Sequence, residues 1–120
     1  MDEILELQKE TLASINEYLG NLIPGMKNAA NELSGDFKED TWEYLRMNMD
    51  GFNWVIQAYN GTQEIINADG IVIDNKDIDA KVDKLGTAYK SKDAAAIATS
   101  INDDIIPFLE KLKEATASFA

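Results

Sequence analysis

The sequence predicts an all-α fold, an up-and-down four-helix bundle with a short third helix and proline-kinked first and last helices. Apolar residues recur at steps of three and four along four segments, which is the spacing of one face of an α-helix. Apolar residues make up 45% of the 120 residues, a content that argues against disorder and suffices for one core. We therefore expect residues 1–120 to form a single helical-bundle domain.

The first predicted helix covers roughly residues 3–33. Pro24 lies inside it, and a proline ring clashes with the carbonyl four residues earlier, here that of Gly20, where the backbone deforms most easily. Because the apolar spacing continues past Pro24, we expect one kinked, continuous helix, with a break at Pro24 as the alternative. Its expected core face is Leu5, Gln8, Leu12, Ile15, Leu19, Leu22, Met26, Ala29 and Leu33.

Capping residues predict where the second helix begins. Gly35 suits a helix C-cap and Asp36 an N-cap, and Glu39 follows at the capping-box position. This pattern predicts a second helix over roughly residues 37–68.

Two further helices follow. A shorter one is expected over roughly residues 75–90 with Asp74 as its N-cap, and Ile71–Ile73 before it could form a buried extended strap. The last helix is expected to begin at Ser91 or Asp93, and Pro107 inside its unbroken apolar spacing predicts a second kink. The expected core residues of these two helices are Ile78, Val82, Leu85, Tyr89, Ala94, Ile97, Ile101, Ile105, Phe108, Leu112, Ala115 and Phe119.

The second helix carries two apolar stripes where a bundle helix usually carries one. At 3.6 residues per turn the stripes lie about 150° apart, with Val55 between them. The first stripe is Trp42, Leu45, Met49, Phe52, Ile56, Tyr59 and Ile66. The second stripe is Tyr44, Met47, Gly51, Trp54, Ala58, Gly61 and Ile65.

Two interpretations of the second stripe remain open. Either the helix is central and contacts neighbours on both sides, or the stripe forms a surface groove for a partner helix or a second copy of the chain. Gly51, Ala58 and Gly61 leave room for another backbone, and Trp54 projects between them. If the groove binds a partner, Trp54 is the expected hot spot.

Charge limits the class of partner. Asp and Glu number 22 against 11 Lys and Arg, for a net charge of −11, and no basic stretch exists to contact phosphates. Nucleic acid and anionic membrane surfaces are therefore not expected as partners. A cationic protein segment would be attracted, although high net charge also keeps a small protein in solution.

Other sequence features predict a cytoplasmic location. The N-terminus, MDEILELQKE, lacks the basic-then-apolar plan of a signal peptide, and no apolar run approaches membrane-spanning length. The absence of cysteine is compatible with the cytosol.

Catalytic residue types are scarce. The chain contains neither histidine nor cysteine, which removes the usual general base, zinc ligands and thiol chemistry, so we expect no enzyme activity and no cofactor. Carboxylates remain, and Glu39 and Glu43 could face Asp103 and Asp104 across the bundle. All-helical magnesium pyrophosphohydrolases hold metal with paired acidic motifs on adjacent helices, but their full pattern is not present here.

Two stretches resemble a small family of uncharacterised acidic helical proteins from Firmicutes. They are GFNWVIQAYNGTQEI at 51–65 and KDAAAIATSINDDIIPFLEKL at 92–112. The matching positions are Gly51, Trp54, Asp93, Pro107 and Leu109. The resemblance implies a helical bundle in a bacterial cytosolic setting and implies no activity. In size, acidity and helicity the chain is also similar to the export chaperones of flagellar and type III secretion systems, which is a fold-level analogy.

These observations favour a non-catalytic protein-binding module, chaperone- or adaptor-like, that acts through the second stripe. The alternatives are a self-associating structural bundle that uses the same stripe, and a carboxylate-metal (Mg) hydrolase. The expected partner is an unknown protein or a second copy of the chain.

Overall fold

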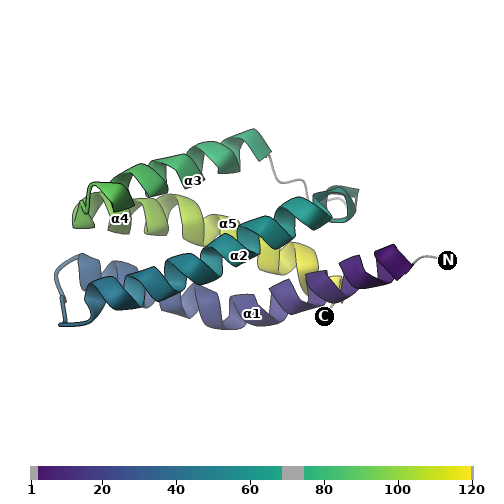
Figure 1. Cartoon of the computed structure of the whole chain (residues 1–120), viewed down its shortest axis with the longest axis horizontal. Coiled ribbons are helices and arrows are strands. Elements are labelled where there is room, and N and C mark those ends of the chain that lie inside the picture. The colour runs from purple at the N-terminus through teal and green to yellow at the C-terminus, as the bar shows by residue number, and fades with distance from the viewer. Residues whose placement is uncertain (1–2, 69–74, 120) are drawn as a thin grey trace.

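The computed structural model describes residues 3–68 and 75–119, which form helices joined by short turns and contain no strand (Figure 1). The last four helical segments follow one another directly and complete a bundle of four helices, so the predicted all-α bundle is confirmed. The elements are α1 (Glu3–Leu33), α2 (Thr41–Ala68), α3 (Asn75–Lys90), α4 (Ala94–Ser100), η1 (Ile101–Ile105), α5 (Ile106–Thr116) and η2 (Ala117–Phe119). The expected cap Asp74 and the strap 71–73 lie outside the described residues.

The helices pack in two closely associated sets. Helix α1 runs along both α2 and α5, while α3 lies against α4 and η1 (Figure 1). The molecule is elongated, with extents of 51 × 25 × 19 Å. The buried faces meet in one apolar cluster to which α1, α2, α3, α4, η1 and α5 all contribute, so a single core holds the bundle together.

Helix α1 continues through Pro24, as the unbroken spacing predicts. The apolar residues on both sides of the proline are buried, because Leu19, Leu22 and Met26 are at most 2% exposed. Pro24 itself is exposed. The backbone hydrogen bond that proline cannot donate is therefore absent at a place that water can reach. The size of the bend at Pro24 stays a prediction.

The last helix accommodates Pro107 through a π-helical turn. Asp93 caps its start, because its Oδ1 accepts a hydrogen bond from the Ala96 N–H at 3.1 Å. In η1 the Ile106 N–H bonds to the Ile101 carbonyl, five residues back. Widening the helix in this way leaves Pro107 directly after the turn, at the start of α5, where a missing N–H is tolerated.

The prediction that the second helix begins near residue 37 is wrong. Helix α2 begins at Thr41, and neither Asp36 nor Glu39 acts as its cap. The Thr41 hydroxyl accepts a bond from the Lys38 N–H at 2.7 Å and donates one to Glu32 Oε1 at 2.8 Å. Because Thr41 is fully buried, its hydrogen bond to Glu32 at the end of α1 fixes the start of α2.

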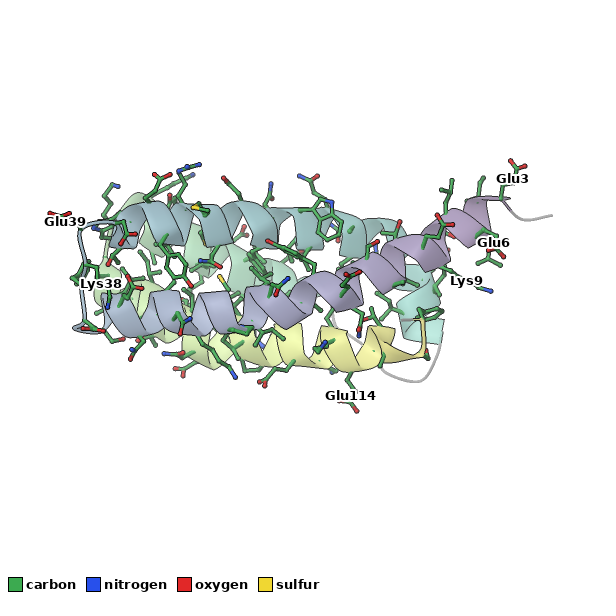
Figure 2. All side chains as sticks on the ribbon, turned by 90° about the horizontal axis from the view of Figure 1, so that it is seen from below. Glu3, Glu6, Lys9, Lys38, Glu39 and Glu114 are labelled. Carbon is green, nitrogen blue, oxygen red and sulfur yellow. The ribbon has the colours of Figure 1, made fainter. Side chains whose placement is uncertain are left out.

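The first turns of α1 project beyond the end of the bundle (Figure 2). The expected core residue Leu5 is consequently 37% exposed, and that assignment is wrong. Glu3, Glu6 and Lys9 also lie on this projecting part (Figure 2). Leu12 is the first fully buried residue of α1.

Candidate functional site

A groove on the outer surface between α1 and α2 contains Trp54. Its volume is about 440 Å³, and it is open to solvent. Polar and aromatic side chains line it, with two residues from α2 and four from α1. We call it the Trp54 groove: Ser14, Glu17, Tyr18, Asn21, Gly51 and Trp54.

The rings of Tyr18 and Trp54 form part of the lining of the Trp54 groove. Tyr18 meets Trp54 edge to face, with ring centroids 5.6 Å apart and planes at 85°. Tyr18 comes this close because Gly51 has no side chain: a Cβ there would overlap the Tyr18 hydroxyl and lie 2.9 Å from its Cζ. Gly51 thus lets the ring of α1 lie against the backbone of α2.

The seven predicted partner-binding residues fall into two groups. Met47 and Trp54 are 60% and 43% exposed, and Gly61 is exposed as well. Tyr44, Gly51, Ala58 and Ile65 are half-buried, and Tyr44, Ala58 and Ile65 pack against the core.

Two glycines of the stripe contact α1, Gly51 through its missing side chain and Gly61 through its backbone carbonyl. Tyr18 occupies the space above Gly51, and the Gln8 side chain donates a hydrogen bond to the Gly61 carbonyl at 3.3 Å. Part of the stripe is therefore a contact with α1, and part is open surface.

The open surface continues onto the projecting end of α1. Ile4 and Leu7 are 73% and 62% exposed, and at 3.6 residues per turn they lie within about 60° of Tyr18 around α1. The helices run antiparallel, with Tyr18 beside Gly51 and Gln8 beside Gly61, so Ile4 and Leu7 extend the exposed surface past the Gly61 end. We call the combined surface the apolar strip: Ile4, Leu7, Tyr18, Met47, Gly51 and Trp54.

The contribution of α1 to this surface is not among the features predicted from the sequence. Ile4, Leu7, Thr11, Ser14 and Tyr18 follow one another at steps of three and four, which is a second stripe on the first helix. That spacing is visible in the sequence. It is a weak signal because two of its five members are polar.

An ion-pair network on α2 borders the apolar strip. Arg46 bridges Glu43, three residues earlier, and Asp50, four residues later, the latter at 3.1 Å. The hydrogen bond from Arg46, followed by its charge, lowers the pKa of Glu43 below its usual value. Glu43 therefore stays ionised at neutral pH, and the cation of Arg46 is shared between two carboxylates.

The carboxylates of the described residues are not gathered into a metal site. Within the described residues no group of three or more metal-ligating side chains lies close enough to hold an ion. Of the acidic residues considered for such a site, Glu43 is paired with Arg46, and Asp104 approaches Lys84 at 3.6 Å.

Another cleft, of about 270 Å³, separates α2 from α3 and is lined largely by core-facing side chains such as Phe52 and Leu85.

Replacing Gly51 by alanine should disturb the Trp54 groove, whereas the same change at Gly61 should not. A Cβ on Gly61 meets open space, so alanine there should stabilise the protein by about 0.5–1 kcal/mol through helix propensity. At Gly51 the gain is offset because the Tyr18 ring must move away from Trp54. Urea unfolding should therefore place Gly51→Ala about 1 kcal/mol or more below Gly61→Ala.

Tryptophan fluorescence in a Trp42→Phe background supplies the second readout for this pair. The Trp54 emission should change in Gly51→Ala and stay constant in Gly61→Ala, because Tyr18 is beside one glycine and not the other. Equal stability and equal emission of the two variants would contradict the assigned role of Gly51.

The chain matches one protein family, over residues 10–115, and that family is described as Domain of unknown function (DUF8042). No curated protein and no solved structure matches the chain. Across residues 3–68 and 75–119, no helix has the length and apolar character required to span a bilayer.

Proposed function

The chain belongs to the DUF8042 family, and from that premise we propose that it is a non-catalytic protein-binding module, chaperone- or adaptor-like, that acts through the apolar strip. The observation that carries the proposal is the clustering of exposed apolar side chains. Six large apolar residues are prominently exposed in the described chain, and four of them, Ile4, Leu7, Met47 and Trp54, belong to the strip. Large apolar side chains gathered on one surface are typical of protein-binding sites.

The chemistry of the strip supports binding rather than a reaction. Its exposed members are aliphatic, thioether and indole side chains, and the polar groups in the groove are Ser14, Glu17 and Asn21. Trp54 lies at the centre of the strip, and Tyr18 packs edge to face against its ring. This contact restricts the Trp54 side chain before a partner binds, so binding loses little side-chain entropy.

The proposal extends to the setting of the protein. The resemblance of residues 51–65 and 92–112 to acidic helical proteins from Firmicutes supports a bacterial cytoplasmic protein. The analogy to export chaperones concerns size, acidity and helicity, and it supports a role in holding a helical segment of another protein.

Capture experiments test this function. Wild-type protein, Trp54→Glu and Phe37→Glu are each immobilised and exposed to lysate of the source organism. Phe37 is a matched control because it is 50% exposed but lies in the α1–α2 turn, outside the strip. The wild type and Phe37→Glu should retain the same specific partner, and Trp54→Glu should lose it, because a buried interfacial charge costs about 2 kcal/mol or more.

Circular dichroism and thermal melts confirm that all three proteins are folded. A Trp54→Glu protein that is folded and still retains the partner would refute the proposed function. Photo-crosslinking from position 47, where the wild-type side chain is 60% exposed, then tells whether the partner lies on the strip itself.

A further inference from the structure

We propose that the partner of the apolar strip is a basic amphipathic helix, with its apolar face in the strip and lysine or arginine side chains along both of its edges. The inference rests on the proposed function, which it deepens by naming the class of partner. It derives from the charges that border the strip on its two outer sides.

The border on α1 is acidic from Glu3 to Glu17. Glu3, Glu6, Glu10 and Glu17 fall within an arc of about 60° on the side of α1 that faces away from α2, and Glu17 also lines the Trp54 groove. All four are exposed. No lysine or arginine falls in this arc, because Lys9 and Lys27 lie on the α5 side of the helix, where Lys27 approaches Glu110 at 3.9 Å.

The border on α2 is acidic as well. Glu43, Asp50 and Glu64 are exposed and lie on the outer side of Met47 and Trp54. The one cation of this border, Arg46, is already bonded to Glu43 and Asp50. The strip is therefore an apolar surface between two rows of carboxylates, which complements a helix with an apolar face and cationic edges.

The length of the strip suits one helix. Gly25 lies beside Asn48, the neighbour of Met47, and from Ile4 to Gly25 α1 covers 22 residues or about 30 Å. A helix of about 20 residues spans that distance. Trp54 and Tyr18 lie near the middle, where the anchor of a binding site is usually found.

Charge argues against a second copy of the chain as the occupant. A symmetric dimer through the strip would bring the acidic borders of both protomers together, in a protein whose net charge is already −11. Like charges placed opposite one another across an interface oppose association. A cationic helix instead relieves the repulsion among the border carboxylates.

Fluorescence anisotropy with designed peptides tests this inference on the full chain. The probes are three labelled peptides of about 20 residues: a leucine and lysine amphipathic helix, the same helix with glutamate in place of lysine, and a scrambled form of the first. We expect the basic helix to bind about tenfold or more tightly than either of the others at about 50 mM salt, and to weaken at about 500 mM.

Two pairs of charge reversals locate the interaction. Glu10→Lys/Glu17→Lys should weaken binding of the basic helix by about tenfold or more, because both residues border the strip. Glu110→Lys/Glu114→Lys makes the same change in net charge on α5, where Glu114 points away from α2 (Figure 2), and should leave binding nearly unchanged. Trp54→Glu should abolish binding of the basic helix.

Each other outcome overturns the inference. Equal affinity for the basic and acidic helices, or no binding of either, contradicts the proposal of a cationic partner. The proposed function is tested separately, by the capture experiment with wild type and Trp54→Glu. Equal weakening by both charge-reversal pairs shows non-specific attraction to an acidic protein. A Trp54-dependent dimer in sedimentation equilibrium assigns the strip to a second copy.

Discussion

Truncation of Tyr59 to alanine should lower the free energy of unfolding by about 3–5 kcal/mol. Tyr59 is 1% exposed and its ring meets Phe108 edge to face, with centroids 5.8 Å apart. The pair joins α2 to α5 within the apolar core, so removing one ring leaves a cavity between the two helices. Because a domain of this size is stable by about 5–15 kcal/mol, urea unfolding should show a large shift of the midpoint.

Trp54→Ala is the matched control for Tyr59→Ala. Both remove an aromatic ring from α2, but Trp54 is 43% exposed and touches α1 only at the outer surface. We expect it to cost about 1 kcal/mol. If the two variants were equally destabilised, the assignment of Tyr59 to the core face and Trp54 to the outer surface would be wrong.

The sequence predicts the helices well where periodicity and caps agree. The expected bounds of the first and third helices, 3–33 and 75–90, coincide with α1 and α3. The start of α2 could not be predicted in the same way, because the bond between Thr41 and Glu32 joins residues nine apart and needs the folded turn. A capping box at Asp36 satisfies only local rules, and the tertiary bond outweighs it.

Periodicity also cannot tell how far a neighbouring helix extends. Leu5 has the correct register for the core face of α1, but it lies in the turns that project beyond the bundle. Similarly, an apolar spacing that passes through Pro107 predicts a continuous helix without distinguishing a kink from the π-helical turn in η1.

The candidate site was predictable in part. The second stripe of α2 follows from its sequence, and Trp54 is its most prominent member. What the sequence leaves open is which neighbour covers which residue, because a buried and an exposed stripe use the same residue types. The structure divides the stripe: Tyr18 covers Gly51, whereas Met47 stays uncovered.

Replacement of Pro24 by alanine should stabilise the protein by about 2 kcal/mol. A proline inside a helix costs about 3 kcal/mol, mainly through the lost hydrogen bond to the residue four earlier, here Gly20. Part of the gain is lost because alanine leaves the unfolded chain more freedom, by about 0.4–1 kcal/mol. Pro24 is exposed, so an alanine there removes little buried surface. Urea unfolding of the two proteins measures the difference.

Gly20 tests whether the two residues act together. A Cβ at Gly20 would lie 4.0 Å from Lys113 Nζ, an ordinary contact, so Gly20→Ala alone should stabilise by up to about 1 kcal/mol. If glycine serves to relieve the clash with the proline ring, its replacement should help less in the wild-type chain than in the Pro24→Ala background. A double-mutant cycle should then show the full stabilisation, about 3 kcal/mol, only in Gly20→Ala/Pro24→Ala.

A decrease in the free energy of unfolding of Pro24→Ala would also be informative about the structure. Leu19, Leu22 and Met26 are buried on both sides of Pro24, and α1 contacts α2 and α5 along this stretch. A destabilised Pro24→Ala protein would mean that these contacts require the bend and that a straighter α1 loses one neighbour. A stabilised protein means that the core imposes the path of α1 and that the proline is only tolerated within it.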